Sequence, residues 1–137
     1  MFRWLRRWRG RTTGAPLTGA PSVRRQKNYS AQSGYVYQYF YEGHRTAERH
    51  GEPCTEYVFE VSADRRSGFR VSIFLPEASL SAWVAEHQRD LTAAERYGLV
   101  KLALFQAFDE RPSPPDLAAP VELRTADVMA IAETLDL

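Results

Sequence analysis

Residues 55–75, TEYVFEVSADRRSGFRVSIFL, decide the fold that the sequence predicts. Apolar and polar side chains alternate over residues 55–62 and again over residues 69–75, a period that is typical of strands with one buried face. The six residues between the two runs end at Gly68, so the pattern predicts an antiparallel hairpin. The face expected in the core carries Tyr57, Phe59, Val61, Phe69, Val71, Ile73 and Leu75. The face expected toward solvent carries Glu56, Glu60, Arg70 and Ser72.

An aromatic strand is expected before the hairpin, over residues 34–45, GYVYQYFYEGHR. Alternation puts every second side chain on the same face, and the residues that share one face are Tyr35, Tyr37, Tyr39 and Tyr41. Such a face can stack bases on an open sheet, as in single-strand binders, or it can pack in the core with the hydroxyl groups at its margin. Because no basic residue interleaves with these tyrosines, the core interpretation is favoured. Residues 46–54 are expected to form a polar loop.

The second half of the chain predicts helices. Thr92 and Glu95 have the spacing of a capping box, which predicts a buried helix over residues 93–110. A further helix is expected over residues 78–88, a short edge strand at residues 120–124, and a last helix from Thr125. The expected order is β-β-β-α-α-β-α. It indicates an α+β fold, with an antiparallel sheet of three to four strands, helices on one face, and a basic N-terminal arm in front.

Charge divides the chain into two parts. Residues 1–27 contain eight basic residues and no acidic one, whereas the other ten basic residues and all 17 acidic residues lie in residues 28–137. The two parts therefore carry net charges of +8 and −7. Residues 10–22, GRTTGAPLTGAPS, have the composition of a linker. Residues 1–27 are thus expected to be a basic amphipathic arm with its linker, and residues 28–137 a single α+β domain.

The arm carries the candidate binding residues. Arginines interleaved with tryptophans suit an anionic membrane surface, because indole rings favour the interface and guanidinium groups favour lipid phosphates. A groove on a partner protein is an equal alternative. Binding of nucleic-acid phosphates needs the same charges but is less favoured, and a tail without a binding role is the remaining interpretation. The candidate residues are Arg3, Trp4, Arg6, Arg7, Trp8 and Arg9.

A catalytic function is not favoured by the sequence. His44, His50 and Cys54 lie close together along the chain, and a Cys–His pair in a site at residues 44–54 is the least favoured hypothesis. No metal-ligand spacing, phosphate-binding loop or cofactor motif is present, so no metal and no cofactor are predicted.

A single cysteine and the lack of an apolar run of membrane-spanning length are typical of a cytoplasmic protein. The sequence therefore predicts a bacterial-type accessory or interaction protein, cytoplasmic or peripheral at the inner membrane face, that docks on an anionic membrane or a larger protein assembly.

Overall fold

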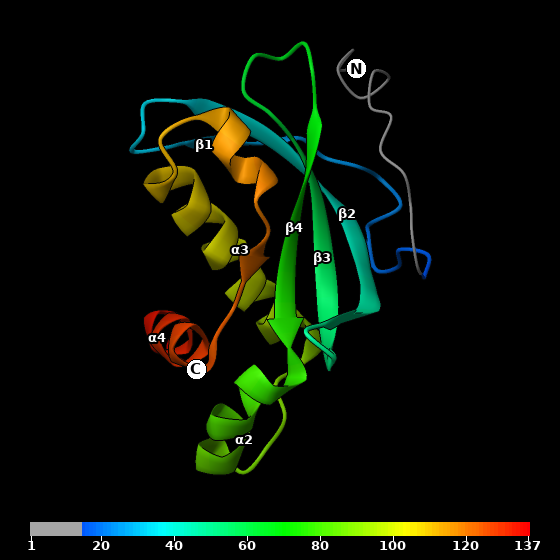
Figure 1. The fold of residues 1–137 in the computed structure, drawn as a ribbon, viewed down its shortest axis with the longest axis vertical. Coiled ribbons are helices and arrows are strands. Elements are labelled where there is room, and N and C mark those ends of the chain that lie inside the picture. Colours follow the sequence, from blue (N-terminus) through cyan, green and yellow to red (C-terminus); the bar gives the residue numbers. More distant parts are fainter. Residues whose placement is uncertain (1–14) are drawn as a thin grey trace.

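A computed structural model describes residues 15–137 of the 137-residue chain. Five strands form one sheet in the order β1-β2-β3-β4-β5. Figure 1 shows α3 and α4 on the same side of this sheet, with α2 beyond the end of β4. In chain order the elements are β1 (Lys27–Ser30), β2 (Val36–Arg49), β3 (Glu52–Ser62), β4 (Phe69–Pro76), the 3-10 helix η1 (Glu77–Leu80), α2 (Ser81–His87), α3 (Ala93–Glu110), the 3-10 helix η2 (Pro114–Ala118), β5 (Val121–Glu122) and α4 (Thr125–Thr134).

The expectation of an antiparallel sheet of three to four strands was wrong. The sheet has five strands and is mixed, because β5 pairs in parallel with β4. A parallel neighbour requires a crossover connection, and here the chain between β4 and β5 contains α2 and α3. The strand missed at the other edge is β1, whose residues pair with the start of β2.

The expected polar loop over residues 46–54 was also wrong. The ladder between β2 and β3 continues to the pair Arg49 and Glu52. Only His50 and Gly51 make the turn, with φ angles of 55° and 77°. Two successive residues with positive φ form the kind of tight turn whose twist matches that of the flanking strands.

Two local predictions were confirmed. The ladder between β3 and β4 forms the expected antiparallel hairpin. The helix expected over residues 93–110 is α3, and its first turn has the capping box that the spacing predicts. The Thr92 hydroxyl accepts a hydrogen bond from the Glu95 amide at 3.1 Å, while the Glu95 carboxylate accepts one from the Thr92 amide at 2.9 Å.

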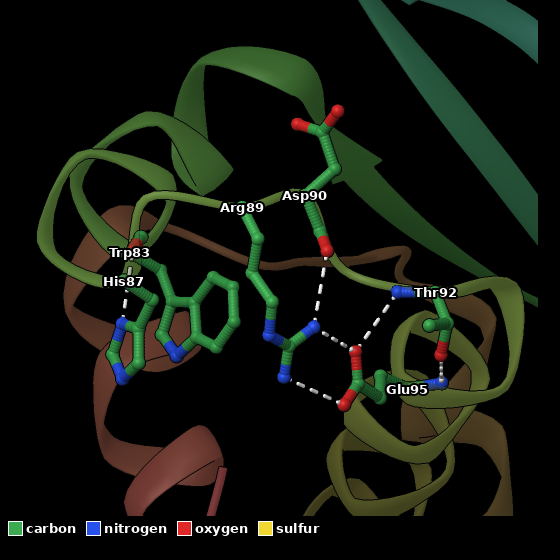
Figure 2. Close-up of polar contacts among 6 residues, drawn as sticks. All are labelled: Trp83, His87, Arg89, Asp90, Thr92 and Glu95. Atoms are coloured by element: carbon green, nitrogen blue, oxygen red, sulfur yellow. Dashed lines mark hydrogen bonds and ion pairs between the residues drawn. The ribbon is translucent and has the colours of Figure 1, made fainter.

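The corner between α2 and α3 is held by charged and aromatic groups, as Figure 2 shows. Both terminal nitrogens of Arg89 donate to the Glu95 carboxylate, at 2.8 and 3.0 Å. The same guanidinium lies 4.9 Å from the centre of the Trp83 ring. The His87 ring stacks on the Trp83 ring, with the two ring centroids 3.9 Å apart. These contacts hold the N-terminal end of α3 against the end of α2.

The inner face of the sheet, which carries Tyr37, Tyr39, Phe59, Val71 and Ile73, forms the core with α3. Apolar residues cover much of the circumference of α3, and its buried side chains include Leu99, Val100, Leu104 and Phe108. Tyr37 stacks on Phe108 with ring centroids 4.4 Å apart. The helix therefore packs along the sheet through aromatic as well as aliphatic contacts.

The outer face of the sheet is defined by Gln38, Phe40, Arg45, Glu56, Val58, Glu60, Arg70 and Ser72, which share one face in the strand register. The expectation that Glu56 and Glu60 face solvent was wrong, because both are buried. Arg45 Nε donates to Glu56 at 2.8 Å, and the Ser72 hydroxyl donates to the same carboxylate at 2.6 Å. Partners of this kind allow a charged carboxylate to remain inside the fold.

A β-bulge in β2 gives this strand its shape. The register with β3 shifts between Tyr41 and Gly43, so the inner face changes from the odd-numbered residues before the bulge to His44 after it. Gly43 has a φ of +123°, and a Cβ atom there would lie 2.6 Å from the Thr18 carbonyl oxygen. Thr18 and His44 exchange two backbone hydrogen bonds, of 2.9 and 2.8 Å, so the chain before β1 approaches the bulge closely.

We expect Gly43→Ala to lower the free energy of unfolding by about 3 kcal/mol, because it combines backbone strain with an overlap against Thr18. Gly51→Ala is the matched control, since Gly51 also has a positive φ but no atom lies within 4 Å of an added Cβ. That variant should lose only about 1 kcal/mol. Urea unfolding of both variants measures the difference, and equal losses would contradict the role assigned to the contact with Thr18.

Candidate functional site

A cavity of about 610 Å³ lies between the inner face of β2 and β3, the N-terminal end of α3 and the chain before β1. We call residues 15–27, which lead into β1 and include its first residue, the N-terminal segment. Gly19 contacts His44 so closely that a Cβ atom would lie 2.5 Å from the imidazole ring. The N-terminal segment therefore closes one side of the cavity, and the volume is in the range usual for small-molecule sites.

Four tyrosines, Tyr39, Tyr41, Tyr57 and Tyr97, line the cavity. Tyr39 and Tyr41 come from the part of β2 that precedes the bulge. Tyr57 comes from β3, and Tyr97 comes from the second turn of α3. The rings of Tyr41 and Tyr97 contact each other at 4.8 Å. The wall is therefore aromatic, and it carries hydroxyl groups that can form hydrogen bonds.

The hydroxyl groups on this wall stay protonated at neutral pH. Burial, with a smaller contribution from Tyr97, raises the pKa of Tyr39 to about 12. Burial also raises the pKa of Tyr41, Tyr57 and Tyr97. The Tyr41 hydroxyl and His44 Nδ1 are 3.0 Å apart and form a hydrogen bond. Neutral hydroxyl groups of this kind can donate a hydrogen bond to a bound anion.

The charged side chains that line the cavity are all cationic. They are Arg24, Arg25, Lys27 and Arg96, and no aspartate or glutamate of residues 15–137 is among the lining residues. Arg24 is paired with Glu42 and Arg96 with Glu77, whereas Arg25 and Lys27 form no ion pair within residues 15–137. Burial lowers the pKa of the neighbouring Lys101, and repulsion from Lys27 adds to this effect.

The first turn of α3 adds a second source of positive potential. Ala93 and Ala94 line the cavity and are the first two residues of this 18-residue helix. Backbone amides at these positions have no acceptor within the helix, and the helix dipole places partial positive charge there. The amide of Glu95 is already satisfied by the Thr92 hydroxyl, so the amides of Ala93 and Ala94 are the ones left for another acceptor.

The structure places the four tyrosines of the expected aromatic face differently from one another. Tyr37 and Tyr39 are buried, with exposed fractions of 0% and 3%, and Tyr41 is half-buried beside α3. Tyr35 is 38% exposed and borders a separate hollow next to η2. The candidate residues of the arm, Arg3 to Arg9, lie outside the described residues.

The histidines and the cysteine of residues 44–54 are not brought together. His44 is on the inner face of β2, while Cys54 is buried opposite Ala47 in the register of the outer face. His50 lies in the exposed turn, with its ring 3.5 Å from Glu122. Burial raises the pKa of the Cys54 thiol, which disfavours the nucleophilic thiolate. Within residues 15–137, no three His, Cys, Asp or Glu residues are grouped so as to hold a metal ion.

The cavity was not foreseen from the sequence, because its lining comes from segments that are far apart in the chain. The N-terminal segment had the Gly and Pro content of a linker, and nothing in that composition indicates that it packs on β2. One local signal was available. A glycine within an aromatic strand, here Gly43, often marks a bulge or a close approach of another backbone.

Searches against protein-family models, curated proteins and solved structures find no match to this chain. Among the described residues, no helix has both the length and the apolar character needed to cross a membrane. The site must therefore be interpreted from its own geometry.

A group of buried charges also lies on the outer face of the sheet. Glu60 is only 4% exposed, and its Cα partner on β4 is Arg70. Burial is the main cause that raises the pKa of Glu60 to about 7; repulsion from Glu42 adds to the rise, and attraction by Arg24 and Arg70 opposes it. Glu60 therefore titrates near neutral pH in the folded protein.

We expect Glu60 to make the folded state less stable as pH rises. Its folded pKa is about 7, above the ordinary value of 4.5, so the native state binds the proton more tightly and stability falls between about pH 4.5 and 7. Glu60→Gln removes this contribution. The free energy of unfolding of this variant, relative to that of the wild type, should therefore be higher at pH 8 than at pH 5. Denaturant unfolding at both pH values measures it. Glu86→Gln, at an exposed position on α2, is the control, and an advantage of Glu60→Gln that does not change with pH would contradict the prediction.

Proposed function

We propose that the protein is an interaction protein whose basic arm docks the α+β body on an anionic membrane surface. The observation that carries this proposal is the division of charge, +8 in residues 1–27 against −7 in residues 28–137, given by eight basic residues in the first part and ten basic with 17 acidic residues in the second. An anionic surface attracts the first part and repels the second, which favours one orientation of the body.

The described part of the arm supports this arrangement. The N-terminal segment contains Arg24, Arg25 and Lys27, and its pairing with β2 holds these cations on one side of the body. The Arg45 guanidinium donates to the Ala15 carbonyl oxygen at 3.3 Å, so the point at which residues 1–14 join the body is also fixed. The cations at residues 24–27 can therefore add to the attraction supplied by the arginines before Ala15.

The composition of residues 1–14 favours a membrane among the anionic surfaces. Each cation close to an anionic bilayer contributes about 1 kcal/mol of binding free energy. Arg3, Arg6, Arg7 and Arg9 together supply about 4 kcal/mol on this basis, and Trp4 and Trp8 add an interfacial preference that a purely electrostatic partner does not use. Ordering the arm opposes binding, so the attachment is reversible.

The alternatives use the same arm with a different partner. A groove on a larger protein assembly would take up the tryptophans, with arginines at its rim. A nucleic acid would take up mainly the arginines, and its mark is an affinity that falls steeply with salt. An enzyme with its site at residues 44–54 is not supported, since Cys54 and His44 face opposite sides of the sheet.

The test is the flotation of three proteins that all retain residues 15–137. They are mixed with phosphatidylcholine vesicles that either contain or lack phosphatidylglycerol. The three are the wild type, a deletion of residues 1–14, and a variant in which Arg3, Arg6, Arg7 and Arg9 are replaced by glutamine. The deletion stops at residue 14 because the N-terminal segment packs on β2. Only the wild type is expected to float, and only with the anionic vesicles, because the glutamine variant loses about 4 kcal/mol of attraction and the deletion, which also removes Arg11, loses about 5 kcal/mol.

A matched control replaces Arg65 and Arg66 with glutamine, since this exposed pair lies in the loop between β3 and β4. That variant should float like the wild type. Flotation of the deletion protein, or failure of the wild type to float at low salt, would overturn the membrane proposal. In the second case, capture on DNA at several salt concentrations separates a nucleic-acid partner from a protein partner.

A further inference from the structure

We propose that the tyrosine-lined cavity binds a small planar aromatic anion, with its ring against the tyrosines and its acidic group at the N-terminal end of α3. This proposal does not rest on the proposed attachment through residues 1–14, because the lining residues that support it all lie within residues 15–137. Such a ligand is supported by the unsatisfied hydroxyl groups, the sign of the lining charge and the size of the cavity.

Two of the hydroxyl groups are placed as a ligand site would require. Tyr39 and Tyr57 are only 3% and 5% exposed, and both line the cavity. Neither hydroxyl forms a hydrogen bond within residues 15–137. The protein does not enclose either hydroxyl completely, because the two are absent from the set of fully buried polar atoms without a partner. Each hydroxyl therefore reaches open space, and the open space beside both residues is the cavity. Buried polar groups are normally satisfied, so a bound polar group is their natural partner.

The charge of the lining selects an anion. Arg25 and Lys27 line the cavity without an ion-pair partner among residues 15–137, and the lining contains no carboxylate. Ala93 and Ala94 line the same cavity, and their backbone amides lie at the positive end of the helix dipole, where no acceptor within the helix is available. A carboxylate, sulfonate or phosphate group placed here would receive backbone donors and cationic side chains at once.

The walls select a flat ring. Tyr41, Tyr57 and Tyr97 expose aromatic surface to a volume of about 610 Å³, which is large enough for a ligand of one to three rings. Aromatic rings favour offset stacking and edge contacts with other rings. A neutral aromatic ligand would leave the cations unused, and a free inorganic anion would leave the aromatic walls without contact.

The probe is 8-anilinonaphthalene-1-sulfonate, compared with N-phenyl-1-naphthylamine, which has the same rings without the sulfonate. Both dyes are titrated into the full-length protein and followed by fluorescence. The anionic dye is expected to bind at least about tenfold more tightly than the neutral dye, because only the sulfonate uses the cationic end of the cavity. In an amide NMR spectrum, its shifts are expected at Gly19, Ala93 and Ala94.

The variant Ala94→Glu tests the site without removing a structural contact. Ala94 is exposed at the second position of α3, where a carboxylate is compatible with the helix dipole, so the fold should be retained. The added charge should weaken binding of the anionic dye at least about tenfold and leave the neutral dye within about twofold. Ala126→Glu places the same residue at the second position of α4 and should bind both dyes like the wild type.

Three outcomes would overturn the inference. The first is that the anionic dye does not bind to the folded wild type. The second is that Ala94→Glu binds it as tightly as Ala126→Glu does, which would place the dye elsewhere, for example on residues 1–14. The third is that Ala94→Glu weakens the binding of both dyes equally while its unfolding midpoint is unchanged. This result would mean that the site selects for an apolar ring and not for an anion.

Discussion

The bulge at Gly43 is the constraint on which the rest of the structure depends. A regular strand through this position would have continued the alternation of residues 35–41, and His44 would have faced outward. The bulge adds one residue, so that Tyr39, Tyr41 and His44 all lie on the side of α3. It also bends β2, and the absent side chain at Gly43 leaves room for Thr18. The pairing of the N-terminal segment, and with it one wall of the cavity, follows from that single glycine.

The two faces of the sheet differ in where their polar groups find partners. On the inner face, the hydroxyl groups of the tyrosines collect at the open end of the core beside cations. On the outer face, charged side chains are buried and compensate each other, as in the group formed by Arg45, Glu56 and Ser72. The ionisation of Glu60 is opposed first by burial and then by the carboxylate of Glu42, and both raise its pKa. The inner face therefore offers positive potential to a ligand, whereas the outer face is mainly an internal network.

The sequence was informative where structure is determined by neighbouring residues. The spacing of Thr92 and Glu95 predicted the start of α3, and alternation predicted the hairpin of β3 and β4, because both signals lie within one element or one turn. The parallel pairing of β5 was not predictable in this way, since the partners of Val121 and Glu122 lie far back in the chain, at Ile73 and Phe74. The same holds for the buried carboxylates, whose alternation with apolar residues looked like that of a solvent-exposed face, and for the cavity, which combines four separate segments.

The strands at the two margins of the sheet are its shortest. β1 has four residues and β5 has two, whereas β2 has 14, and the margin of β2 beyond β1 is met by Thr18 at His44. An edge of this kind offers few free amide and carbonyl groups to a strand from another chain. Short edge strands are one of the devices that limit edge-to-edge aggregation, and this sheet has one on each side of longer strands that are rich in the aromatic and β-branched residues that favour it.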